Sequence, residues 1–518
     1  MKTRAKIEFG DFQTPVALSR EVCHLLAELK IDAGIVIEPT CGEGSFIQAA
    51  AETFPKARLQ GFDINVRHLE RARSRLASMA LNGRIALQHQ DFFAFDWDSY
   101  LAKRRGRILV LGNLPWVTNS AVAAINGSNL PKKQNFQGLR GFAAKTGKSN
   151  FDISEWMLIR LLQALRGKQA VLAILCKTST ACKVLRFAWQ NDGRVASAAL
   201  YRIAAAKHFN AAVDACLFIA WLGRSGGSEA LIFDSLHDTV PERRVGLAGK
   251  DLVSDLTNYE RLKHLEGFCP YQWRSGLKHD CASVMELEPI PHGHFRNKLG
   301  ESVALEETFV YPLLKSTDLA KGRSLPTRAV LVTQRHPGDN TTVIAQRAPL
   351  TWRYLQQHHD AFDARKSSIY AKGGDFAIFG VGDYSFAPWK VAVSGLHHAF
   401  RFVVVPPRRG RPVMFDDTCN FLPFSNECEA RTVARILNSA QSFEFLRSLV
   451  FPGAKRPLTI ELLQRLNISA IAEEAGHSAA WQASRGTAYS TPTVTAQLPL
   501  VMERSPRPRR KVLTAGIR

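Results

Sequence analysis

The sequence predicts an α/β fold whose first half is a mostly parallel sheet with helices on both faces. Short apolar runs alternate with helical stretches up to about residue 245, a pattern typical of strand–helix–strand units. Glycine, acidic or amide residues stand where several of these runs end, and ligands of such sheets bind at the carboxyl ends of the strands. From residue 246 onward, strand-like pieces mix with long loops, Gly and Pro, which indicates a separate α+β domain.

The runs assigned to strands follow one another with helices between them. They are GIVIEP (34–39), ARLQGFDI (57–64), RIALQHQDFF (84–93), RILVLGNLPW (107–116), KQAVLAILCKTS (168–179), RVASAALYRI (194–203) and DACLFIAWLG (214–223). The helices include SFIQAAAETF (45–54), RHLERARSRLASMA (67–80) and SEWMLIRLLQALR (154–166). We therefore expect a domain over residues 1–245, a second over 246–470, and a flexible basic tail over 471–518.

The net charge and the cysteine pattern indicate the kind of partner and the cellular compartment. The 518 residues carry a formal net charge of +22, from 68 Lys+Arg against 46 Asp+Glu. This balance favours a nucleic acid as the partner over an anionic membrane surface. No apolar run is long enough to span a membrane, and we expect no secretory signal, because the charged N-terminus has no apolar h-region. The nine cysteines form no C-x-x-C pair, so we expect reduced thiols in the cytoplasm.

The first candidate site is IEPTCGEGSF (37–46), where a strand ends at Glu38 and a helix starts near Ser45. Gly42 and Gly44 would let a ligand approach the helix N-terminus closely, although a plain tight turn explains them equally well. Asp63 ends the next strand, where an acidic residue reaches a ribose diol. Its structural alternative is an N-cap for the helix that follows.

The third and fourth strand ends continue the series. Asp91, followed by Phe92, could accept a hydrogen bond from an adenine amino group, or could simply stabilise a turn. The fourth strand ends in GNLPW (112–116). A turn with a buried Trp would also account for this segment, but four consecutive strand ends then carry ligand-suited residues in the order that a nucleoside cofactor requires.

This series resembles the amino-methyltransferases of DNA that use S-adenosylmethionine (SAM). EPTCGEGSF resembles their motif I, GFDI motif II, QDFF motif III and NLPW the catalytic (N/D/S)-P-P-(Y/F/W) motif IV. DFQTPVALSREV (11–22) resembles motif X, KSNFD (148–152) the segment after motif IV, and HFNAAVDACLFI (208–219) motif VIII. This is the gamma order, and the resemblance covers roughly residues 8 to 225. It implies a Rossmann-like class I SAM-dependent fold followed by a target-recognition domain.

The resemblance also implies residue roles. SAM would be held by Thr14, Pro15, Glu38, Pro39, Cys41, Gly42, Gly44, Asp63, Ile64, Asp91, Phe92 and Asn113. Catalysis would fall to Asn113, Leu114, Pro115, Trp116 and Phe209. Asn113 and the Leu114 carbonyl would accept the two N–H bonds of an exocyclic base amine, in line with the SAM methyl. The base would be flipped out of the duplex, with Trp116 stacked on one face and Phe209 covering the other, although Phe209 could equally be a core aromatic.

One departure from the family bears on the chemistry: Leu114 stands where the first Pro of motif IV is usual. The backbone carbonyl is present whatever the side chain. What is lost is the fixed φ of proline, and Pro115 still restricts Leu114 to an extended conformation. We therefore expect activity to survive.

The 246–470 region resembles the target-recognition domain of the family, notably in residues 379–395 and 412–422. Candidate DNA contacts are residues 272–281, residues 365–368 and the loop 119–150, each of which could instead be a solvated basic surface. G-K-S at 147–149 does not fit a phosphate-binding loop, because Phe142 stands where its first glycine belongs. Cysteine and histidine spacing does not fit zinc, so no metal is expected.

The resemblance therefore implies double-stranded DNA as the partner, with room for a separate cognate restriction endonuclease. Adenine N6 is the expected target. N4 of cytosine is the nearest alternative, since both targets are exocyclic amines. A non-catalytic DNA-binding subunit with a degenerate SAM site is an alternative of another class.

Overall fold

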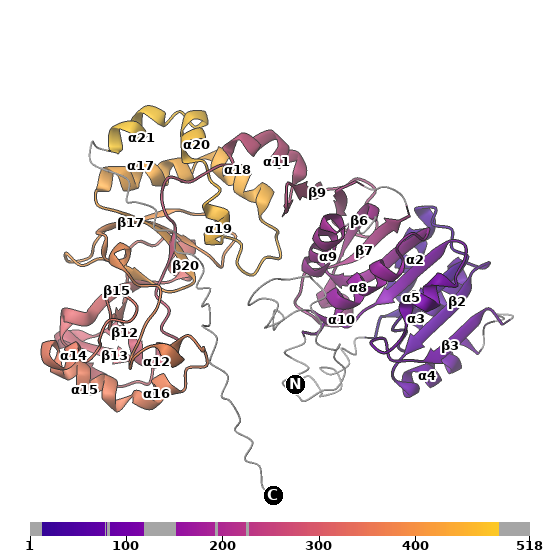
Figure 1. Cartoon of the computed structure of the whole chain (residues 1–518), viewed down its shortest axis with the longest axis horizontal. Helices are drawn as coiled ribbons and strands as arrows, with labels where there is room; N and C mark the ends of the chain where they lie inside the picture. The colour runs from indigo at the N-terminus through magenta and orange to yellow at the C-terminus, as the bar shows by residue number, and fades with distance from the viewer. Residues whose placement is uncertain are drawn as a thin grey trace, which may run out of the picture.

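The computed structural model describes residues 13–77, 79, 83–118, 152–191, 195–223 and 227–485. Figure 1 shows an N-terminal half and a C-terminal half lying side by side. The N-terminal half is built on a ten-stranded sheet, and the C-terminal half on a four-stranded and a six-stranded sheet. The predicted α/β fold is confirmed.

The large sheet has the strand order β10-β9-β8-β6-β7-β5-β4-β1-β2-β3. Its strands are β1 (Ile35–Glu38), β2 (Arg58–Asp63), β3 (Ile85–His89), β4 (Ile108–Asn113), β5 (Ala170–Lys177), β6 (Val195–Ile203), β7 (Ala215–Leu222), β8 (Glu229–Phe233), β9 (Arg243–Ala248) and β10 (Asp251–Val253). β1 pairs in parallel with both β2 and β4, and β2–β3 and β4–β5 are parallel as well. The chain therefore winds outward in both directions from a switch point between β1 and β4, which is where ligands bind in such folds.

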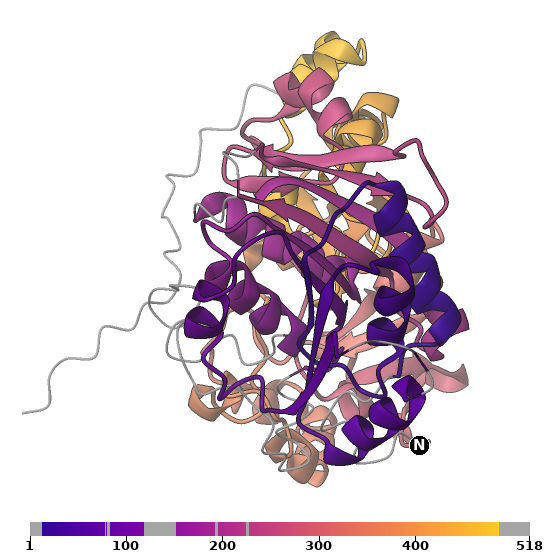
Figure 2. The same ribbon diagram turned by 90° about the vertical axis from the view of Figure 1, so that its right-hand side faces the viewer.

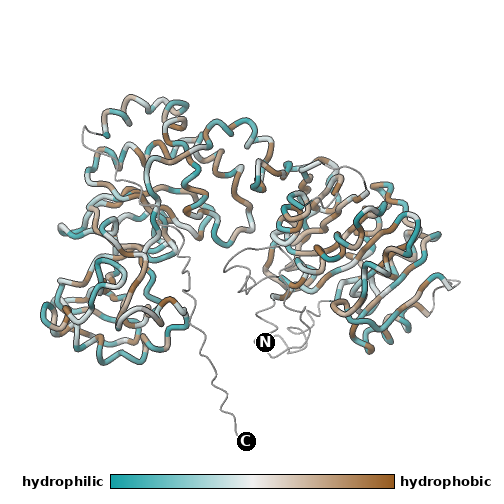
Figure 3. Tube along the Cα trace, in the orientation of Figure 1, coloured by the Kyte–Doolittle hydropathy of each residue, from teal (hydrophilic) through white to brown (hydrophobic). Residues whose placement is uncertain are grey.

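Helices cover both faces of this sheet, as Figure 2 shows. They are α2 (Val16–Glu28), α3 (Ser45–Thr53), α4 (Val66–Leu76), α5 (Trp97–Ala102), α8 (Ile153–Ala164), α9 (Thr178–Gln190) and the short α10 (Ala205–Phe209). Successive strand residues alternate between two cores: Val36 packs with α2 and α3, whereas Ile37 packs with α5 and α8. The hydrophobic segments of the N-terminal half accordingly follow the strands (Figure 3).

The sheet extends past the expected boundary at residue 245, because β9 pairs antiparallel with β8 and β10 pairs antiparallel with β9. β10 also connects the two halves. Val253 is buried in the core of the C-terminal half. The Asp251 carboxylate accepts hydrogen bonds from Arg186 of α9 at 2.9 Å and from Arg465 of the C-terminal half at 3.2 Å.

The C-terminal half combines two mainly antiparallel sheets with helices. The four-stranded sheet contains β11 (Arg274–Ser275), β20 (Cys419–Phe424), β17 (Trp389–Ser394) and β18 (Val403–Val405). The six-stranded sheet contains β14 (Ser302–Ala304), β13 (His294–Asn297), β12 (Glu286–Pro289), β16 (Arg328–Leu331), β15 (Val310–Leu314) and β19 (Met414–Phe415), of which β15 and β19 pair in parallel. Its main helices are α11 (Leu256–Leu262), α12 (Ala282–Met285), α13 (Ser316–Ala320), α14 (Val343–Arg347), α15 (Pro349–Gln357), α16 (His359–Asp363), α17 (Glu427–Leu437), α18 (Ala440–Leu449), α19 (Ile460–Leu463), α20 (Ile468–Glu474) and α21 (Ser478–Ser484).

The expected boundary at residue 471 is wrong, because α20 and α21 belong to the folded part, which continues to Arg485. Ile471 and Trp481 are buried in the core of the C-terminal half. The Trp481 indole N–H donates to the Tyr271 hydroxyl at 2.9 Å. The segment is rich in Ala and Ser, so its composition alone does not indicate that Ile471 and Trp481 are core residues.

The cysteines are all free thiols, and only Cys428 is exposed. Within the described ranges, the helices are too short or too polar to cross a membrane.

Lys390 of β17 is a buried amine in the C-terminal half. Its side chain is 1% exposed, and Nζ donates to the carbonyls of Ala387 and Val413, both at 2.9 Å. Burial lowers the pKa of Lys390 to about 7. A neutral amine still has two N–H donors, which match the two carbonyls.

This burial predicts a pH-dependent contribution to stability. An unfolded lysine has a pKa of about 10.4, so between about pH 7 and about pH 10 the unfolded chain binds more protons than the folded one. Stability therefore rises with pH in this window, by up to about 1.4 kcal/mol per pH unit. Urea unfolding at about pH 7 and about pH 9 should show a smaller rise for Lys390→Met than for the wild type. The exposed Lys263→Met variant should keep the wild-type rise, and equal rises for all three proteins would contradict the assignment.

Candidate active site at the carboxyl ends of strands β1 to β4

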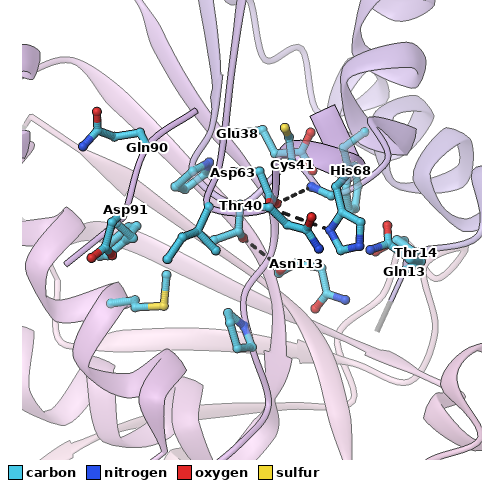
Figure 4. Close-up of a pocket in the computed structure, with 18 of the residues that line it drawn as sticks. Gln13, Thr14, Glu38, Thr40, Cys41, Asp63, His68, Gln90, Asp91 and Asn113 are labelled. Atoms are coloured by element: carbon cyan, nitrogen blue, oxygen red, sulfur yellow. Dashed lines mark hydrogen bonds and ion pairs between the residues drawn. The ribbon is translucent and has the colours of Figure 1, made fainter. Parts of the chain in front are cut away.

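A pocket of about 840 Å³, including space open to solvent, lies at the carboxyl ends of β1, β2, β3 and β4. Figure 4 shows the labelled side chains converging on it from separate elements. Of the residues expected to hold a cofactor, those that line it are Thr14, Glu38, Pro39, Cys41, Gly42, Asp63, Ile64, Asp91, Phe92 and Asn113. The strand-end prediction thus brings together residues that are far apart in the sequence.

Two expected cofactor residues, Pro15 and Gly44, do not line the pocket. Pro15 is the N-cap residue of α2. Gly44 is the N-cap residue of α3 with φ +79°, and a Cβ there would lie 3.0 Å from the Cβ of Ala72. Both residues shape the backbone behind the pocket wall and leave the ligand contacts to their neighbours.

Sequence reasoning missed several lining residues: Gln13, Thr40, Ser45, Phe46, Asn65, His68, Gln90, Phe93 and Met157. Most of them are sequence neighbours of predicted site residues, so their positions within or beside the motifs could have identified them. His68 and Met157 differ, because each lies on a helix away from a strand end. From helical periodicity alone, a residue that lines a pocket cannot be distinguished from a residue of the hydrophobic core.

The glycine loop after β1 is fixed by contacts with two other segments. Gly42 has φ +51°, and a Cβ there would lie 2.5 Å from the Gln13 side-chain oxygen. Its N–H donates to Asp63 Oδ2 at 2.8 Å, while the Glu43 N–H donates to Gln13 at 3.0 Å. Glycine is therefore required at position 42 by both conformation and space.

Asp63 is not the N-cap of the following helix. Asn65 occupies that position and accepts from the Arg67 N–H. Asp63 instead accepts from the Gly42 and Asn65 N–H groups, at 2.8 and 2.7 Å. Each carboxylate oxygen has a further lone pair, so the contacts described leave capacity for a diol donor.

Glu38 brings a buried carboxyl group to the pocket. It is 3% exposed, and its Oε2 atom has no hydrogen-bond partner among the described residues. Burial raises the pKa of Glu38 well above its usual range, and the nearby Asp63 carboxylate raises it further. A buried carboxyl that forms no ion pair with the residues the structure describes fits a positively charged ligand group, such as the ammonium of SAM. Close packing maintains this burial, since a Cβ on Gly112 would lie 3.1 Å from Glu38 Cγ.

The β3 end of the pocket suits a flat ring. Ile64 is 36% exposed although it is a large apolar residue, and it lines the pocket with Phe92 and Phe93. Asp91 accepts from the Phe93 N–H at 2.9 Å, so it does stabilise a turn. Its carboxylate also faces the pocket as a possible acceptor for an amino group, and the two roles are compatible.

The segment Asn113–Trp116 leaves β4 at the pocket edge. Asn113 and Pro115 line the pocket, and the Asn113 carbonyl accepts from Thr40 Oγ1 at 3.2 Å. The Leu114 side chain points away from solvent: it is 1% exposed and belongs to the α5–α8 core. Burial of this side chain restrains the backbone at the position where the family usually has proline.

Trp116 and Phe209 do not form two walls of a base pocket. The indole is 7% exposed and donates to the Leu175 carbonyl at 3.3 Å. The two rings contact each other edge to face, with 5.0 Å between centroids. This is the spacing of one aromatic pair, so a base ring does not fit between them in this structure. Phe209 supports the Trp116 indole.

The candidate DNA contacts have mixed surroundings. Within 272–281, Trp273, Leu277 and His279 are buried, whereas Arg274 lies over the Tyr384 ring at 4.5 Å. Arg365 stacks on Tyr370 and donates to the Ala377 carbonyl at 2.7 Å, so Arg365 supports the fold locally. The expected contacts in 119–150, and the start of the motif X segment before Gln13, lie outside the described residues.

A family profile described as a methyltransferase domain matches residues 31–103. Among solved structures, an rRNA methylase from Streptococcus thermophilus is 19% identical, with 41% of this chain and 98% of that chain covered and a TM-score of 0.25. The plantazolicin methyltransferase BpumL in complex with SAH is 18% identical, with 32% and 49% covered and a TM-score of 0.20.

A curated relative spans both halves. The type II methyltransferase M.NspV from Nostoc sp. (strain ATCC 29411 / PCC 7524) is 43% identical over 475 residues, which cover 91% of this chain and 98% of the relative. A match of that length takes in residues of both halves. The chain therefore belongs to the type II methyltransferase family.

Proposed function

We propose that this chain transfers a methyl group from SAM to the N6 amine of an adenine in duplex DNA, as the modification component of a restriction–modification system. The observation that carries the proposal is the placement of Asn113 and Pro115 on the wall of a pocket that suits an adenosyl cofactor. The order of the sequence motifs and the net charge of +22 support DNA as the substrate.

SAM is the methyl donor of a methyltransferase of this kind, and the pocket residues fit it. Glu38 would hold the ammonium group, Asp63 the ribose hydroxyls and Asp91 the adenine amino group, with Ile64 and Phe92 against the adenine ring. When bound, SAM supplies a methyl group on a positively charged sulfur. Three carboxyl groups in one pocket suit that positive charge.

The residues of the chain would activate the target amine by accepting its hydrogens. The lone pair of an exocyclic amine is delocalised into the base ring. Bonds to the Asn113 side-chain oxygen and the Leu114 carbonyl would favour a tetrahedral nitrogen. Among the described residues, the Leu114 carbonyl accepts no backbone hydrogen bond from the turns and loops. Catalysis is then positioning and electrostatics, without a strong general base.

A target base cannot reach Asn113 while stacked in a duplex, so we infer that it is flipped out. It would meet Pro115 first, because Pro115 lines the pocket and the Trp116 indole is nearly buried. Stacking on the indole face would require Trp116 to turn outward.

We assign the N-terminal half to catalysis and the C-terminal half to reading the DNA sequence, with Arg274 and Lys366 as candidate contacts. A separate nuclease as functional partner and a bacterial cytoplasmic location belong to the same proposal.

N4 methylation of cytosine requires the same two hydrogen-bond acceptors as N6 methylation of adenine. The identity of the methylated nucleoside therefore distinguishes the two target bases. Transfer of labelled methyl from SAM to unmethylated duplex DNA, followed by nucleoside analysis, should yield N6-methyladenine. N4-methylcytosine would move the target to cytosine. SAM binding with no transfer to any DNA would favour the non-catalytic alternative. Sequencing of modified bases in DNA exposed to the protein would also give the recognition site.

Replacing Asn113 with alanine should remove one of the two acceptors for the amine. We expect kcat to fall by about 100- to 1000-fold, the usual effect of losing one transition-state hydrogen bond. In steady-state assays kcat and kcat/KM for DNA should fall together. Asn191→Ala, which removes an exposed amide at the C-cap of α9 that donates to the Phe187 carbonyl, is the matched control and should keep full activity. Full activity of Asn113→Ala would refute the mechanism.

The burial of Glu38 predicts that cofactor binding releases a proton. The pKa of Glu38 is raised in the free protein, and an ammonium group bound beside it would lower that pKa. Affinity for S-adenosylhomocysteine should therefore increase with pH above the ordinary carboxyl range, by at most about tenfold per pH unit. Calorimetry between about pH 6 and about pH 8 should show this slope for the wild type and a flatter one for Glu38→Gln. Identical slopes would exclude Glu38 as the group that loses the proton.

A further inference from the structure

Lys177 is the last residue of β5. It contacts the segment Asn113–Trp116, here called the catalytic loop, but it does not line the cofactor pocket. Its ammonium group donates to the Trp116 carbonyl at 3.2 Å and to the Asp152 carboxylate. The Lys177 and Asp152 side chains are 21% and 7% exposed. Because the pair is largely shielded from water, its charge-assisted bonds are stronger than those of a surface ion pair.

Asp152 is itself fixed by the segment that follows it. It is the N-cap residue of α8, and its Oδ1 atom accepts from the Ser154 backbone N–H at 3.2 Å and from the Ser154 hydroxyl at 2.5 Å. Its backbone forms an antiparallel bridge with Thr118, and the Ile153 N–H donates to the Val117 carbonyl at 2.9 Å. The start of α8 thus holds the chain just beyond Trp116.

The loop is restrained by hydrogen bonds from several segments, and those of Lys177 are among them. Thr40, in the loop after β1, holds the Asn113 carbonyl, and the Leu175 carbonyl holds the Trp116 indole. Lys177 holds the Trp116 carbonyl and ties it to the helix N-terminus. Leu114 and Pro115 lie between the restrained residues Asn113 and Trp116, so their backbone direction depends on both ends.

We propose that Lys177, through its ion pair with Asp152, is a positioning residue that fixes the backbone of Asn113–Trp116 for transfer to the target amine. This inference rests on the proposed function. An ammonium group is suited to the task because it donates to a carbonyl and a carboxylate at once. Loss of the pair would let the loop backbone shift, and a displacement of about 1 Å in a positioning group can cost about 100-fold in rate.

A neighbouring ion pair offers a matched control. Lys183 of α9 donates to Glu155 in the first turn of α8 at 3.0 Å, and Glu155 is as buried as Asp152. Both pairs therefore tie a lysine to the N-terminal turn of the same helix. The Lys183 side chain is 56% exposed against 21% for Lys177, so Tm is measured to report any difference in the stability that the two pairs contribute. Of these two lysines, only Lys177 also contacts the Asn113–Trp116 loop, so a loss of kcat without a matching fall in Tm is assigned to that contact.

The experiment compares wild type, Lys177→Met, Lys177→Arg and Lys183→Met as full-length proteins. Measured are kcat and KM with SAM and duplex DNA, the Kd of S-adenosylhomocysteine, and Tm. For Lys177→Met we expect kcat to fall by about 10- to 100-fold, with the Kd changed by less than about threefold because Lys177 does not line the pocket. Lys177→Arg, which can donate to both partners, should recover most of kcat, and Lys183→Met should stay near wild type.

Asp152→Asn covers the case in which Lys177→Met does not fold, since asparagine remains a good N-cap while the charge is lost. It should lower kcat in the same way, and its effect should not add to that of Lys177→Met. Unchanged kcat in Lys177→Met or Asp152→Asn, equal losses in Lys177→Met and Lys183→Met, or no recovery with arginine would each overturn the proposal. A wild type without methyl transfer would instead overturn the proposed function.

Discussion

The structure depends on the switch point between β1 and β4, where parallel strands bring their carboxyl ends to one edge of the sheet. Glu38 and Asn113 end these two strands, and Gly112 lets them approach closely because a side chain there would press against Glu38. The proximity places a buried carboxyl beside Asn113, the first residue of the proposed catalytic loop. The cofactor and the target amine of the base would therefore meet at the switch point, where the backbone of the sheet leaves a crevice.

The unusual residue of the loop is explained by the same packing. Proline fixes a backbone by covalent restriction, whereas Leu114 fixes it by burying its side chain in the α5–α8 core. The second mechanism depends on neighbours, so it requires the surrounding contacts of Thr40, Leu175 and Lys177. A departure from the family pattern that looks damaging in the sequence is compatible with an ordered loop in the folded chain.

The sequence predicted the parallel strands and most of the pocket, because a strand end followed by Gly, Asp or Asn is a local signal. It did not predict Met157 or the Lys177–Asp152 pair, since these contacts join segments that only the fold brings together. It left two roles open for Phe209, because an aromatic residue before a strand can equally face a ligand or another ring, and in the structure the ring contacts Trp116. It also ended the folded part too early, since small residues surround the core residue Trp481.

Charge is distributed in a way that suits two different partners. The whole chain carries a net charge of +22, yet Glu38, Asp63 and Asp91 all face one pocket. A strongly basic protein that needed only to bind a polyanion would gain nothing from burying Glu38, which forms no ion pair with the described residues, since burial disfavours the charged form of the carboxyl. The cost is offset if a small cationic ligand enters the pocket. The acidic pocket within a basic chain thus favours a cationic methyl donor on the inside and a nucleic acid on the outside.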